Sequence, residues 1–152
     1  MKSSPKRGVW AICLFEDPKT RRVLGIAALS LAFSACRGRD EGLPGRYGDV
    51  AVPEAALASK EASNRGRALF LEHCALCHGE RADGRGVRRE GLTSPPRDFT
   101  DPGWRLRTSP RRVFYTIREG VRGTAMPAWA ALGDSDVWDL VAYLRSVAGN
   151  RP

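Results

Sequence analysis

The segment from Cys74 to His78 constrains this chain more than any other part of its sequence. It reads Cys-Ala-Leu-Cys-His, which places two thiols three positions apart and an imidazole directly after the second thiol. Such a C-x-x-C pair occurs in thioredoxin-like redox proteins, in halves of zinc sites and, when His follows, at covalent haem attachments. Each use requires a different surrounding sequence, so the rest of the chain decides between them.

The surrounding sequence favours haem. A zinc site needs two further ligands, yet His73 and His78 are the only histidines and lie in the same six residues. A thioredoxin-like pair needs a strand–helix–strand context, and no strand pattern is present. In haem attachment, Cys74 and Cys77 add to the two vinyl groups of one haem, and His78 lies beneath the iron as proximal ligand. We therefore predict one covalently bound haem c.

The first 35 residues are typical of an export signal rather than of a folded element. Arg21 and Arg22 precede an uncharged run over residues 23–35, shorter than the about 20 residues that a membrane-spanning helix needs. Residues 33–36, Phe-Ser-Ala-Cys, resemble the bacterial lipobox, in which the cysteine becomes the lipidated first residue. We expect a lipoprotein-type signal peptide over 1–35, a lipid on Cys36 and a membrane-anchored location on the periplasmic side. The alternative is cleavage at the A-x-A-like residues 32–34, which would release a soluble periplasmic protein.

Length and charge fit one small exported domain. The 152 residues suffice for a single ordinary domain. The chain has 25 Lys and Arg and 17 Asp and Glu; six of the basic and two of the acidic residues lie in 1–35, so the remainder carries a formal charge of +4. The basic pairs 88–89 and 111–112 are scattered, and we interpret them as solvated surface. No nucleic-acid partner is therefore predicted.

A tether and a helical domain follow the signal. Residues 36–58 are rich in Gly, Pro, Ala and charge and lack an apolar period, which predicts a flexible tether. The alternative is that part of this segment, residues 53–57, packs on the domain. Residues 59–149 then carry helical patterns and form the predicted domain. Within it, Gly and Pro break residues 79–103 into a loop.

Three helices are predicted in this domain. The first begins at Ser59, whose side chain can cap it. The second begins at Ser109, with proline in its first turn, and ends at Gly120. The third has acidic residues at its positive end, from Asp134, and ends at Gly149. Two tryptophans are assigned to the apolar core: Trp129 and Trp138.

A further set of residues resembles the class I cytochrome c family over about residues 59–149. In that family, a Gly and an aromatic residue four positions apart on the first helix cross the last helix at a Leu and a Tyr. Here Gly66 and Phe70 match the first pair, and Leu140 and Tyr143 match the second. Glycine permits close helix approach, and aromatic rings fill the crossing. The resemblance implies an all-α cytochrome c fold with three to four helices packed around one covalent haem.

The resemblance also implies a distal iron ligand. Family members use a methionine in an irregular loop before the last helix, and residues 123–129, Gly-Thr-Ala-Met-Pro-Ala-Trp, look like that loop. Met126 is the only methionine beyond the start residue, and we expect it to bind the iron. The rival ligand His73 directly precedes Cys74 on the proximal side, so we interpret it as a surface residue.

The remaining haem contacts come from the same resemblance. The family's proximal histidine donates its other ring N–H to a backbone carbonyl of a proline-containing loop, and Pro95 or Pro96 is the candidate. Arg97, Trp104 and Arg105 are candidates to bind the haem propionates. Core packing for Trp104 and solubility for the two arginines are the open alternatives.

Ligation by His78 and Met126 would leave no iron position open for oxygen or peroxide, which leaves one-electron transfer. We therefore expect an electron carrier rather than an enzyme, relaying electrons between exported or membrane respiratory redox partners and using no small-molecule substrate. The first alternative is a haem-bearing subunit of a larger membrane oxidoreductase complex. The second is a haem peroxidase or gas sensor. The single C-x-x-C-H motif counts against a dihaem peroxidase.

Overall fold

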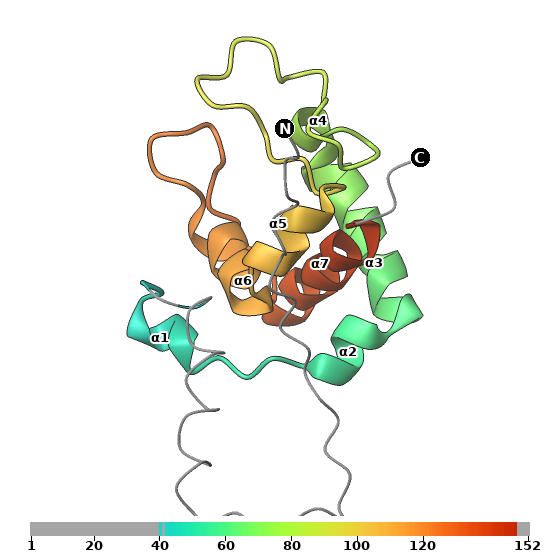
Figure 1. Cartoon of the computed structure of the whole chain (residues 1–152), viewed down its shortest axis with the longest axis vertical. Helices are drawn as coiled ribbons and strands as arrows, with labels where there is room; N and C mark the ends of the chain where they lie inside the picture. Colours follow the sequence, from blue (N-terminus) through green and yellow to red (C-terminus); the bar gives the residue numbers. More distant parts are fainter. Residues whose placement is uncertain (1–39, 41, 149–152) are drawn as a thin grey trace, which may run out of the picture. The chain divides into compact units, whose positions relative to one another are not determined.

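The computed structural model describes residue 40 and residues 42–148, and every regular element in this part of the chain is a helix (Figure 1). In chain order the helices are α1 (Gly45–Gly48), α2 (Glu54–Ala58), α3 (Lys60–His73), α4 (Ala75–His78), α5 (Pro102–Arg107), α6 (Pro110–Glu119) and α7 (Asp134–Val147). The expected all-α fold is confirmed. None of these helices combines the length and apolar character needed to cross a membrane. The predicted signal peptide over 1–35, the lipid on Cys36 and the helix stop at Gly149 lie outside the described residues.

The predicted helix starts are present, and each has a local cause. The hydroxyl of Ser59 accepts a hydrogen bond from the amide of Ala62, at 3.2 Å, and begins α3. In the same way Ser109 accepts from the amide of Arg112, at 3.0 Å, and begins α6. Gly120 follows α6 with a φ of 69°, which only glycine adopts readily.

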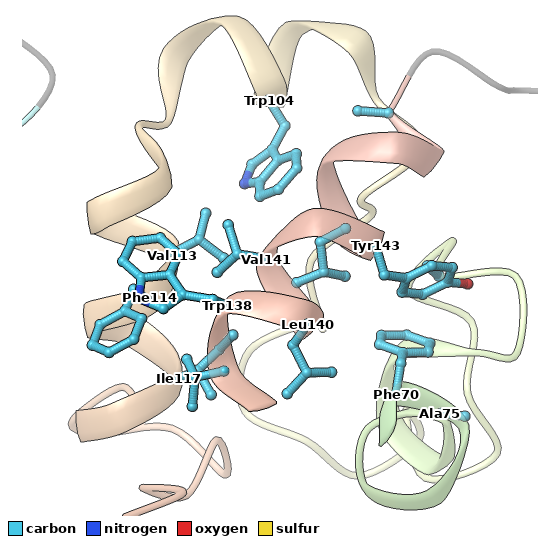
Figure 2. Close-up of a cluster of buried hydrophobic side chains, with 14 of the residues drawn as sticks. Phe70, Ala75, Trp104, Val113, Phe114, Ile117, Trp138, Leu140, Val141 and Tyr143 are labelled. Carbon is cyan, nitrogen blue, oxygen red and sulfur yellow. The ribbon is translucent and has the colours of Figure 1, made fainter. Parts of the chain in front are cut away.

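Helices α3 and α7 cross in direct backbone contact at Gly66. A Cβ added there would lie 1.9 Å from the backbone oxygen of Asp139, so no side chain fits between the two helices. Beside the crossing, the guanidinium of Arg65 donates to both carboxylate oxygens of the buried Asp139, at 2.6 and 2.9 Å. The rings of Phe70 and Tyr143 meet at 5.2 Å between centroids (Figure 2). The crossing predicted from the sequence is therefore present.

Helix α6 packs on α7 through a second aromatic contact. The ring of Phe114 stacks on Trp138, with centroids 4.5 Å apart and planes inclined by 29° (Figure 2). Val113 and Ile117 lie on the same buried side of α6. Trp138 is thus a core residue, as predicted.

Helix α5 is a short element that the sequence analysis assigned in part to a loop. The carboxylate of Asp101 accepts a hydrogen bond from the amide of Gly103, at 2.9 Å, and Pro102 occupies the first turn. Trp104 lies on this helix and is buried. Its ring meets the ring of Phe99 edge to face, with the centroids 5.0 Å apart. The helix is held by this burial, because six residues are too few for a stable isolated helix.

Residues 43–58 differ from the flexible tether predicted over 36–58, because they pack against the domain. We call them the N-terminal strap. Tyr47 of α1 is buried against Phe114 and Tyr115, with ring centroids 6.3 and 5.0 Å apart. Its hydroxyl donates to the carboxylate of Glu119 at the end of α6. Tyr47 therefore docks the strap, and the partly buried Leu43, Val50, Val52 and Leu57 pack against the same core. These are long-range contacts that composition does not indicate.

Two further contacts bind the strap, and Asp40 just before it, to the start of α6. The backbone oxygen of Val50 accepts from the guanidinium of Arg111, at 2.7 Å. The carboxylate of Asp40 accepts from the hydroxyl of Ser109 and pairs with Arg111 at 3.2 Å. Asp40 and the strap are thus part of the folded domain.

Gly66→Ala tests the helix crossing. The added methyl cannot fit beside Asp139, so the two helices must separate, and we expect the free energy of unfolding to fall by at least about 2 kcal/mol. Guanidinium titration of the haem-loaded protein measures this loss. Gly48→Ala is the matched control, because this helical glycine has no atom within 4 Å of an added Cβ. Equal stability of the two variants would show that the crossing is looser than described.

Tyr47→Ala tests the docking of the strap. Loss of the buried ring is expected to cost about 3 kcal/mol of unfolding free energy. Tyr47→Phe keeps the ring and removes only the hydrogen bond to Glu119, so its cost should be smaller. Hydrogen bonds from Tyr47 and Arg46 lower the pKa of Glu119, so the cost of Tyr47→Phe should shrink as the pH falls below the ordinary glutamate value of 4.5. An unchanged stability of Tyr47→Ala would mean that the strap does not pack.

Candidate haem site

One cavity of about 500 Å³ is lined by residues from several helices and from the loops between them. Its lining includes the C-x-x-C-H segment and Met126, which lie far apart in the sequence. Most of the remaining lining is apolar, and Arg97 is the only Lys, Arg, Asp or Glu among the described residues that form it. The lining residues used below are Cys74, Cys77, His78, Phe99, Trp104 and Met126.

The two thiols stand where α3 passes into the short helix α4. The amide of Cys74 donates to the carbonyl of Phe70, at 2.8 Å, and the amide of His78 donates to the carbonyl of Cys74, at 2.9 Å. Both cysteines are half-buried and free of a disulfide. Burial raises the pKa of the Cys74 thiol to about 11, and the neighbouring Cys77 adds to the effect. At neutral pH Cys74 is therefore a protonated thiol.

A backbone carbonyl fixes the orientation of the His78 ring. Nδ1 lies 3.1 Å from the carbonyl oxygen of Arg97, which can only accept, so Nδ1 carries the proton. Burial lowers the pKa of His78, opposed by this hydrogen bond, and the ring is held neutral with Nε2 free to bind a metal. The predicted acceptor was the carbonyl of Pro95 or Pro96. It is instead the carbonyl of Arg97, because every residue of the loop carries such a group and only the packing of the loop decides which one reaches His78.

Aromatic rings pack around the His78 imidazole. Phe99 lies 4.9 Å from it and Phe70 lies 6.4 Å from it, measured between centroids. Phe99 also meets Trp104, so one row of rings connects α5 to the imidazole. Sequence reasoning missed Phe99, since a single phenylalanine in an irregular loop has no period that marks it as buried.

The other predicted residues divide between the cavity and the surface. Trp104 and Arg97 line the cavity, as expected of residues near a haem. Arg105 does not line it and is exposed on α5, because its neighbour Trp104 occupies the buried side of that short helix. The propionate role expected of Arg105 is therefore not supported.

Two further residues lie in places that the sequence analysis did not predict. Trp129, assigned to the core, is half-buried and lines the cavity. His73, assigned to the surface, lines it too, and its ring lies 5.1 Å from that of Trp129. The loop after Met126 therefore returns to the end of α3.

The side chains present fit a covalently attached haem. Two thiols, one neutral imidazole and one thioether face an apolar cavity, which suits a flat apolar ring with its own iron. In the described residues, no group of three or more His, Cys, Asp and Glu could hold a bare metal ion. The donor set is therefore suited to a metal carried in an organic ring.

A helical domain that combines a C-x-x-C-H segment and a methionine in one apolar cavity has the features of a c-type cytochrome. The family described as cytochrome c oxidase, cbb3-type, subunit III matches residues 61–144, more than half of the chain. The chain belongs to this family. The expected cytochrome c fold and haem c cofactor are thereby confirmed.

Curated relatives and one solved structure agree with this assignment. The chain is 27% identical over 141 residues to the cbb3-type cytochrome c oxidase subunit CcoP of Azospirillum brasilense, covering 90% of this chain and 45% of that protein. It is 35% identical over 95 residues to cytochrome c55X of Stutzerimonas stutzeri, covering 59% of this chain and 70% of that protein. A chain of the reducing HAO-like protein complex of Kuenenia stuttgartiensis matches with a TM-score of 0.53 and 26% identity, over 59% of this chain and 45% of that one. The chain thus spans less than half the length of the oxidase subunit.

Proposed function

We propose that this chain is a one-electron transfer protein whose haem c is one redox centre of a larger membrane oxidoreductase complex. The family is described by an oxidase subunit, and the relatives named CcoP and FixP are subunits of cbb3-type cytochrome c oxidase. These similarities favour the subunit alternative over the separate electron carrier that was the main expectation. Because the chain is also similar to cytochrome c55X, a separate electron carrier is the second candidate.

The observation that carries the proposal is the meeting of His78, Met126 and the two thiols in one cavity. In the proposed site, Cys74 and Cys77 would hold haem c through thioether bonds, and His78 Nε2 and the Met126 sulfur would bind its iron. When bound, haem c supplies an iron couple that exchanges one electron.

The residues of this chain would restrict that chemistry to electron transfer. With His78 and Met126 both bound to the iron, no coordination position would be left for oxygen or peroxide, so the chain itself would catalyse no reaction on a small molecule. The apolar lining would disfavour water near the iron, and the Arg97 carbonyl would keep the imidazole in one orientation, so little would have to rearrange when the charge changes. Redox proteins are therefore the proposed partners.

We also propose that the domain works on the periplasmic side of a membrane, anchored by a lipid on Cys36. The signal-like residues 1–35 and the family support this location. Asp40 is already bound to Ser109 and Arg111 of the domain. Four residues of chain span at most about 14 Å, so a lipidated Cys36 would hold the domain close to the membrane surface.

Met126→Ala tests the proposed ligation. The purified oxidised protein should show a far-red charge-transfer band that this variant lacks, and the reduced variant should bind carbon monoxide. Val113→Ala is the matched control, since it trims another side chain of the same cavity and should retain the band. Tight binding of carbon monoxide by the unmutated reduced protein would contradict the proposal and favour a gas sensor or peroxidase.

Isolation of the tagged full-length chain from the membranes of its native host tests the complex. We expect its haem c to elute in detergent with other redox subunits of an oxidase and to be reoxidised during oxygen consumption by that complex. Elution of the haem-loaded chain by itself, with unchanged oxygen consumption in a strain that lacks it, would instead establish the carrier.

A further inference from the structure

The loop that carries Met126 starts and ends at the same helix. We call residues 121–129 the Met126 loop; it lies between α6 and α7 (Figure 1). The amide of Val121 donates to the carbonyl of Met126, at 3.1 Å, and the amide of Trp129 donates to the carbonyl of Ile117, at 3.0 Å. Inside the loop, the Met126 amide donates to the hydroxyl of Thr124, at 3.2 Å. The loop is therefore closed on the last turn of α6 rather than free.

Gly120 makes the first of two anchors for this loop. Its φ of 69° and ψ of −166° belong to a region that is essentially restricted to glycine. A Cβ at Gly120 would lie 2.6 Å from the Met126 oxygen, 2.7 Å from the Pro127 carbonyl carbon and 2.8 Å from the Ala128 nitrogen. All three atoms belong to the backbone, so no side-chain rotation can relieve the overlap. The end of α6 and the segment bearing Met126 touch only because residue 120 has no side chain.

Trp129 makes the second anchor, at the other end of the loop. Its ring lies 5.1 Å from the ring of His73, and both side chains are half-buried in the cavity lining. His73 is the last residue of α3 and directly precedes Cys74. The loop therefore rests against the segment that carries the thiols as well as against α6.

We propose that Gly120 and Trp129 are positioning residues that hold the Met126 thioether at the iron. This rests on the proposed function, in which Met126 is the distal ligand. Neither residue needs to touch the iron, because each acts on the backbone of the loop. For Met126 to leave the iron, the loop must lift from one or both anchors, so weakening either anchor should increase the fraction of molecules with an open axial position.

The first test compares two glycines of the same segment. In Gly120→Ala the overlap with Met126 is relieved only when the loop lifts, so the variant should bind added imidazole about tenfold more tightly in the oxidised haem-loaded protein. Its far-red band should weaken in parallel. Gly123→Ala is the matched control, since Gly123 also has a positive φ, of 77°, but no atom within 4 Å of an added Cβ. This variant shares the backbone strain but not the overlap with Met126, so its imidazole affinity should rise less than that of Gly120→Ala.

The second test compares two tryptophans. Trp129→Leu should also raise the imidazole affinity, because the contact with His73 is lost. Trp138→Leu should lower the guanidinium midpoint without raising the affinity, because Trp138 stacks on Phe114 in the core. Should Gly120→Ala take up too little haem for titration, this pair decides the inference.

The outcomes separate this inference from the function on which it rests. Equal imidazole affinities within each pair, with the far-red band retained, would overturn the positioning role and leave His78 and Met126 ligation standing. Absence of the band from the unmutated protein would overturn Met126 ligation, and the inference would fall with it.

Discussion

The contact between the backbones of α3 and α7 determines where the rest of the structure can lie. Gly66 lets the two helices touch, and the ion pair of Arg65 with the buried Asp139 holds them in register. One turn further along α3, Phe70 packs on Tyr143, and its carbonyl receives the Cys74 amide. The position of the thiols therefore follows from the helix crossing. A shift of the two helices at the crossing would move Phe70 and, with it, the cysteines that line the cavity.

The cavity is completed by irregular segments held through their backbones. The carbonyl of Arg97 orients His78, and the carbonyls of Met126 and Ile117 close the loop at the end of α6. Side chains supply the apolar walls, notably Phe99 and Trp104. The end of α4 and the Met126 loop thus present a neutral imidazole and a thioether to one space, where the two groups would bind the iron of a haem that transfers one electron.

The features that could be predicted from the sequence are those with local causes. Ser59 and Ser109 begin helices through hydrogen bonds to amides three residues away, and C-x-x-C-H specifies its chemistry within five residues. Features that depend on distant partners were missed or misplaced. Tyr47 docks the strap on residues more than sixty positions away, and Trp129 meets His73 across the cavity. The carbonyl that binds His78 was placed on the wrong residue, because every residue carries such a group.

The covalent haem motif, the all-α class, the starts of the main helices and the glycine at their crossing could all be predicted from the amino-acid sequence. These follow from spacing, capping and steric rules that act within a few residues. Three features depend on how the whole chain packs: which carbonyl holds the imidazole, which arginine stays outside the cavity, and how Asp40 and the strap join the domain. The tertiary structure also revealed that Gly120 contacts the Met126 segment, because close approach of two backbones depends on how the whole chain packs.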